Sequence, residues 1–248
     1  MSAFPAVDTV LLDLTALEQR FRANRDRRAL FATAYRTMTT KILHGLETGI
    51  FEDSEWASGY TAAFAKLYFN ALADFDAGRR DRVPKAWIIS FETAVANSVL
   101  AVQDLTLGVN AHINHDLAYA LRGVSIEPRE KRYRDHTIVN EILKSATDAV
   151  QSAIAQAYAP ALAVMEELAG PVDEKLVNFS LVKARENAWV QAVALADAPD
   201  AAHRKRVEDN IEAQSAVMAN LVVLATAKFP YLIPVLQRLE AKRLTLVG

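Results

Sequence analysis

The stretch Gly108-Val-Asn-Ala-His-Ile-Asn-His-Asp-Leu117 lies within a run from Pro84 to about Leu121 that has no further proline and only one glycine. Because proline and glycine are the residues that most often end helices, this run predicts one long helix. Pro84 suits its first turn, where a backbone N–H is not needed. Gly108, one turn before His112, indicates a bend or the close approach of a neighbouring element. We therefore expect a long central helix whose polar residues lie deep in the fold.

Five side chains that can bind protons, metals or ligands lie in this stretch. A helix repeats every 3.6 residues, so His112 and Asp116 share one face, and Asn110 and Asn114 share a neighbouring stripe. His115 lies three residues from His112. Each buried polar group without a partner would cost about 1–3 kcal/mol. We therefore expect either a tight hydrogen-bonded network or a hydrated cavity.

The composition predicts an all-α protein with a substantial core. Of the 248 residues, 52% are hydrophobic, and glycine and proline number only eight each. We expect one domain over residues 1–248, because no repeat or linker divides the chain. It should be a bundle of about eight or nine helices around the central one. The predicted helices cover residues 8–23, 26–48, 54–78, 84–121, 129–158, 160–169, 171–196, 199–228 and 230–243.

Charge and missing motifs exclude several classes of function. A net charge of −2 gives no general attraction to nucleic acid, so we expect no such partner. Without cysteine there is no disulfide, thiolate nucleophile or cysteine-ligated metal. The chain has no P-loop, dinucleotide fingerprint or Gly-x-Ser-x-Gly elbow, so we expect no nucleotide cofactor. The start does not resemble a secretory signal, and no apolar run is long enough to span a membrane, which predicts a soluble cytoplasmic protein.

Several short motifs together resemble a known family. They are Asn110-Ala-His-Ile-Asn-His-Asp-Leu117, Phe51-x-Asp53, Phe64-Ala-x-x-Tyr68, Pro84-x-x-Trp87 with Phe91, Asp135 with Asn140, and Arg185-x-x-x-Trp189. This set is similar to the domain of unknown function DUF5995, a helical family of bacteria and fungi, and it spans most of the chain. The resemblance implies a helical fold and supports the choice of site residues, but the family carries no assigned activity. His44 and His115 are not fixed features of its pattern, so the resemblance favours His112.

One interpretation of the polar stretch is a divalent metal site. His112, Asp116 and His115 offer nitrogen and oxygen ligands from one helix. Further ligands from neighbouring helices would be Asp135, His136 or His44. The chain contains neither His-Glu-x-x-His nor the Glu-x-x-His pair of di-iron helical bundles, so no metal-specific motif supports this interpretation.

A second interpretation makes His112 a general acid or base, because histidine titrates near physiological pH. Asp116, Asp135 or an asparagine would orient the imidazole, and Asn110 and Asn114 would orient the substrate or the helix. The predicted ligand-binding wall adds Tyr68, Trp87 and Arg185. Such a site fits a hydrolase, lyase or cyclase acting on a fairly apolar small molecule, because that chemistry needs only proton transfer and shape.

A third interpretation gives the same residues no chemistry. A buried hydrogen-bond network can hold two long helices in register, or bind a small ligand without changing it. Arg185, with Trp189 one turn later, also allows two interpretations. Its guanidinium either faces an acidic group of a ligand or forms an interior salt bridge while its stem covers apolar surface. The sequence thus leaves two hypotheses, a small-molecule enzyme centred on His112 and a non-catalytic ligand-binding or structural protein.

Overall fold

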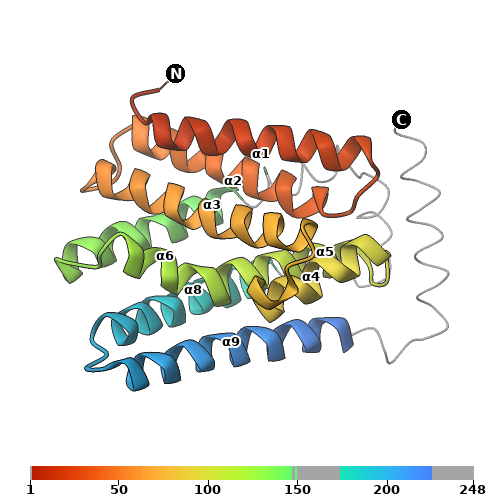
Figure 1. The fold of residues 1–248 in the computed structure, drawn as a ribbon. Helices are drawn as coiled ribbons and strands as arrows, with labels where there is room; N and C mark the ends of the chain where they lie inside the picture. Colours follow the sequence, from red (N-terminus) through yellow and green to blue (C-terminus); the bar gives the residue numbers. More distant parts are fainter. Residues whose placement is uncertain (1, 147–148, 150–173, 225–248) are drawn as a thin grey trace.

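The computed structural model describes residues 2–146, 149 and 174–224. All regular elements in these ranges are helical and none is a strand, which confirms the all-α prediction. Figure 1 shows the helices in three layers that run roughly side by side. None of the described helices combines the length and the apolar character that crossing a membrane requires.

The first layer consists of α1 (Pro5–Ala23), α2 (Ala29–Glu47) and α3 (Ser54–Asp76). Proline stands in the first turn of α1, as expected for a residue without a backbone N–H. Asp53 caps α3 by accepting a hydrogen bond from the backbone N–H of Trp56 at 3.0 Å. Because α1 packs along α2 and both contact α3, the apolar faces of the three helices meet in one core.

The middle layer contains the polar stretch of residues 108–117. It consists of α4 (Lys85–Ala96), α5 (Ala101–Asn110), the π-helical turn η2 (Ala111–Asp116) and α6 (Leu117–Gly123). Residues 129–146 form a further helix. The turn η2 contacts α3 on one side and α8 and α9 on the other, so the predicted deep position of this segment is confirmed.

The predicted single helix from Pro84 to Leu121 is wrong, because the chain breaks between α4 and α5. Asn97 has a left-handed backbone conformation with φ 52°, and Leu100 is extended. Asparagine adopts this conformation more readily than most residues, so it can end a helix as glycine does. From Ala101 to Gly123 the helical path continues through η2.

Gly108 lies where two helices approach each other closely, which is one of the two possibilities that the sequence indicated. A Cβ atom there would lie 2.7 Å from two ring atoms of Phe31 on α2. The missing side chain therefore lets α5 pack against α2 at this point.

The third layer consists of α8 (Glu174–Ala196) and α9 (Ala201–Leu224). α8 packs on α6, and α9 packs on α4, α5 and η2. These helices agree with the predicted ones at 171–196 and 199–228, as far as the structure describes them. The predicted helices at 160–169 and 230–243, and the end of the one at 129–158, lie outside the described residues.

Candidate functional site

His112 and Asp116 form a buried pair within η2. They are 4% and 2% exposed, and Nδ1 of His112 lies 3.2 Å from Oδ2 of Asp116. The predicted proximity of the two side chains is therefore confirmed. The turn between them is π-helical rather than α-helical, which no sequence pattern had indicated.

The Asp116 carboxylate receives hydrogen bonds from three rings. Nε1 of Trp87 donates to Oδ2 at 2.8 Å, and Nδ1 of His115 lies 2.8 Å from Oδ1. Burial alone would raise the pKa of Asp116, but the hydrogen bonds from His112 and His115 outweigh it and lower the pKa. Asp116 is therefore ionised at neutral pH and acts only as an acceptor.

His112 lies among aromatic rings. Its imidazole stacks on the Phe64 ring with 3.5 Å between centroids and 8° between planes, and the Tyr35 ring meets it edge-on with 4.5 Å between centroids. The rings of Trp87 and Tyr68 follow at 6.1 and 6.3 Å. Burial lowers the pKa of His112, against the opposing effect of Asp116, so the imidazole is neutral at pH 7.

Three buried polar atoms of these rings have no hydrogen-bond partner among the described residues. They are Nε2 of His112 and the hydroxyl groups of Tyr35 and Tyr68. Burial raises the pKa of both tyrosines, so their hydroxyls stay protonated and can donate. Tyr35 was not among the predicted site residues, because a tyrosine at helical spacing is more often a core residue.

His115 carries a positive charge and joins η2 to α9. Its Nε2 lies 3.2 Å from Oε2 of Glu212, and the other oxygen of Glu212 accepts the backbone N–H of Lys85 at 2.9 Å. Burial lowers the pKa of His115, but hydrogen bonds to Asp116 and Glu212 raise it to about 9. His112 and His115 thus differ in charge at pH 7 although three residues separate them.

The two asparagines form a separate pair. Nδ2 of Asn114 donates to Oδ1 of Asn110 at 2.9 Å, and Nδ2 of Asn110 donates to the Ser215 carbonyl at 2.9 Å. Asn110 therefore holds the end of α5 to α9, and Asn114 bonds to Asn110 rather than to His112. The predicted neighbouring stripe is confirmed, and its role in the described structure is to join helices.

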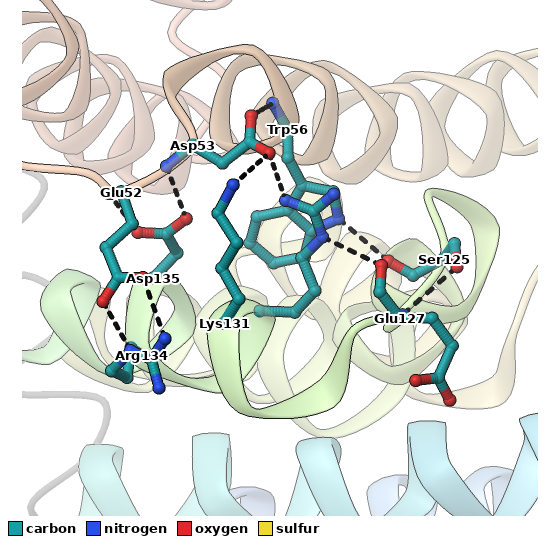
Figure 2. A network of polar contacts seen from close by, with 9 residues as sticks. Glu52, Asp53, Trp56, Ser125, Glu127, Lys131, Arg134 and Asp135 are labelled. Atoms are coloured by element: carbon teal, nitrogen blue, oxygen red, sulfur yellow. Dashed lines mark hydrogen bonds and ion pairs between the residues drawn. The ribbon is translucent and has the colours of Figure 1, made fainter.

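Asp135 lies in another network, at the start of α3. Its two carboxylate oxygens accept the backbone N–H groups of Glu52 at 2.7 Å and of Asp53 at 3.0 Å. Figure 2 shows this arrangement, with Arg134 and Lys131 reaching Glu52 and Asp53 from the helix of residues 129–146. The structure thus joins Asp135 to the turn before α3 rather than to His112.

Arg185 on α8 also lies in its own cluster. Nε donates to Oδ1 of Asn140 at 2.7 Å, and Nη2 donates to the carbonyl of His136 at 2.8 Å. The Trp189 ring packs on the rings of His136 and Tyr133 at 5.5 and 5.2 Å. Of the predicted site residues, the structure therefore brings Tyr68, Trp87 and His115 to the His112 pair, but not Arg185.

A small cavity lies beside the His112 pair, on the far side of Tyr68 and Trp87, and neither His112 nor Asp116 lines it. This cavity of about 10 Å³, room for one water molecule, is bordered by Tyr68, Trp87 and the ion pair of Arg27 and Asp104. Within the described ranges, no three His, Cys, Asp or Glu side chains gather as ligands for a metal ion. The proposed ligands instead hydrogen-bond to one another through Asp116.

The sequence model of a family of unknown function, DUF5995, matches residues 7–225. The chain belongs to this family. The matched range includes η2 with His112 and Asp116. It also includes α8 with Arg185 and the helix of residues 129–146. No match was found among curated proteins or among solved structures.

Proposed function

We propose that the His112–Asp116 pair is the acid–base centre of a small-molecule enzyme of the hydrolase, lyase or cyclase type. One observation carries this proposal: Nδ1 of His112 is held by Asp116, while Nε2 is buried and has no hydrogen-bond partner among the described residues. An imidazole with one nitrogen oriented by a carboxylate and the other free has the arrangement of a general base.

The protonation states support this role. Because the Asp116 carboxylate is acceptor-only, Nδ1 of the neutral His112 must carry the proton. Nε2 then carries the lone pair and can take a proton from a substrate or a water molecule. The lowered pKa of His112 keeps this form populated at neutral pH.

The surrounding side chains suggest what kind of substrate would fit. The Tyr35 hydroxyl, whose ring centroid lies 4.5 Å from that of His112, is a donor that could stabilise negative charge developing on a substrate oxygen. The rest of the wall is aromatic, which favours an apolar substrate. Phe64, which covers one face of the imidazole, is only partly buried, so a rotation of this ring would open His112 to a ligand.

A second candidate is a non-catalytic protein in which the same residues stabilise the fold. Its specific support is that Asp116 accepts from three side chains and that His115 extends the network to Glu212 on α9. Such a network ties α4, η2 and α9 together without chemistry.

The two candidates are separated by His112→Gln, with His44→Gln on the exposed side of α2 as the matched control. We expect a screen with apolar p-nitrophenyl esters and lactones to find turnover that falls by about 100-fold or more in H112Q and not in H44Q. The rate should rise with pH through a pKa below 6.5 and then level off, because the base must be deprotonated. Unchanged turnover in H112Q would refute the proposal.

Melting temperature gives the complementary measurement. If H112Q melts much lower than H44Q while ligand binding persists, the non-catalytic candidate is favoured. Elemental analysis of tag-free protein purified without chelator tests the metal hypothesis in the same samples. Near-stoichiometric metal that is lost in H112Q would make His112 a ligand instead of a base.

A further inference from the structure

Arg185 is a buried cation whose described partners are all neutral. It is 3% exposed, and its guanidinium contacts Oδ1 of Asn140 at 2.7 Å, the carbonyl of His136 at 2.8 Å and Nδ1 of His136 at 3.2 Å. Arginine stays protonated in proteins, so these contacts do not remove its charge.

The ionisable neighbours of Arg185 do not supply a negative charge. His136 is fully buried, and both burial and the adjacent guanidinium lower its pKa, so it is neutral. The Tyr60 hydroxyl lies 3.5 Å from Nδ1 of His136, and burial raises its pKa despite Arg185. Tyr60, His136, Asn140 and Arg185, called the Arg185 cluster below, therefore carry a net positive charge.

The acidic residues that adjoin Arg185 on α8 and His136 on the helix of residues 129–146 have other partners. Glu186 accepts the Tyr133 hydroxyl at 2.7 Å, and Asp135 accepts the backbone N–H groups before α3. Among the residues that the structure describes, no carboxylate forms an ion pair with Arg185. Arg27, the other buried arginine there, does have a buried carboxylate partner, since its Nε lies 3.0 Å from Asp104.

A buried ion is costly unless a counter-charge accompanies it, and arginine suits oxyanions because its donors form a planar fork. The hydrogen bonds of Arg185 to Asn140 and His136 use Nε and Nη2, and the Tyr60 hydroxyl is a further neutral contact of the guanidinium, so none of these contacts supplies a counter-charge. We propose that the Arg185 cluster is a binding site for a small oxyanion, the carboxylate or phosphate group of a ligand.

This site is distinct from the His112 pair, although aromatic rings connect the two. Tyr60 stacks on Phe64 at 6.2 Å, and Phe64 stacks on His112 at 3.5 Å. The anion site stands on the charge and burial of Arg185 alone, and so it does not depend on His112 being catalytic.

The test is isothermal titration of the full chain with sodium phosphate and, separately, with sodium acetate, against chloride at equal ionic strength. Arg185→Met removes the charge at similar side-chain length, and Arg20→Met removes an exposed arginine as the matched control. We expect the wild type and R20M to bind at least one anion saturably, and R185M to bind it more than tenfold more weakly. At ten times the dissociation constant, the anion should raise the melting temperature by about 3–6 °C.

The two anions distinguish a phosphate ligand from a carboxylate ligand. If R185M does not fold, Arg185→Lys keeps the charge but loses the fork, and we expect at least tenfold weaker binding in that variant too. The proposal is overturned if the wild type binds neither anion saturably, or if the Arg185 variants bind as the wild type does. A rise in melting temperature that is equal in R185M would indicate a general salt effect and would also overturn it.

Discussion

The charge on His115 predicts that the protein loses stability as the pH rises from 6.5 towards 9. In the folded chain His115 is held between Asp116 and Glu212, at 2.8 and 3.2 Å, and its pKa is raised to about 9. In the unfolded chain it titrates near 6.5. Unfolding therefore releases a proton within this pH range, and stability falls as the pH increases.

The magnitude follows from the two pKa values. The interval from 6.5 to about 9 corresponds to about 3 kcal/mol, at about 1.4 kcal/mol per pKa unit. This stabilisation is fully present below pH 6.5 and lost above pH 9. Of the neighbouring groups, Asp116 and Glu212 have lowered pKa values and stay charged in this range, and His112 opposes the loss only close to pH 6.5, where the unfolded chain still protonates it in part.

The assay is urea unfolding, followed by tryptophan fluorescence at constant ionic strength across this pH range. The perturbation is His115→Gln, and the exposed His44→Gln is the control. We expect the wild type and H44Q to lose about 3 kcal/mol of unfolding free energy, and H115Q to lose much less. If H115Q showed the same pH dependence as the wild type, the ion pairs of His115 would not be its source and the reasoning would fail.

Two further predictions concern packing and the start of α3. Gly108→Ala should cost about 1–3 kcal/mol, because its Cβ would collide with the Phe31 ring, whereas Gly59→Ala on the exposed face of α3 should be neutral or stabilise by up to about 1 kcal/mol. Equal unfolding midpoints for the two variants in urea would contradict this. Asp135→Ala should cost about 2–5 kcal/mol, because two backbone N–H groups at residues 52–53 lose their acceptor. A melting temperature close to that of the wild type would instead leave Asp135 free for a role in activity.

Most helix boundaries could be predicted because their causes are local. The start of α3 follows from Asp53, and the ends of α2 and α3 follow from the glycines at 49 and 78, which set the backbone within a turn. The first helix was predicted from residue 8, but α1 already begins at Pro5. The break after α4 was missed because Asn97 carries a weaker signal than glycine or proline. The π-helical turn was missed because the spacing of polar residues in it also fits an α-helix.

The candidate site was predictable only where its residues are neighbours along one helix. His112 and Asp116 are four residues apart, so the helical repeat alone places them together. Asp135 and Arg185 come from other helices, and the structure brings them to the turn before α3 and to His136 instead. The residue types alone did not indicate that Asp135 and Arg185 would have these partners instead of His112.

The sequence by itself determined that this protein is helical, where most of its helices begin and end, and that a polar segment lies in its interior. These properties depend on backbone preferences and on a hydrophobic pattern that repeats within a few residues. Only the tertiary structure decided that His115 is charged while His112 is neutral with a free Nε2, and that Arg185 is buried among neutral partners. The physical reason is that burial and partners from other layers, such as Glu212, set a group's charge, and these depend on packing between segments far apart in the chain.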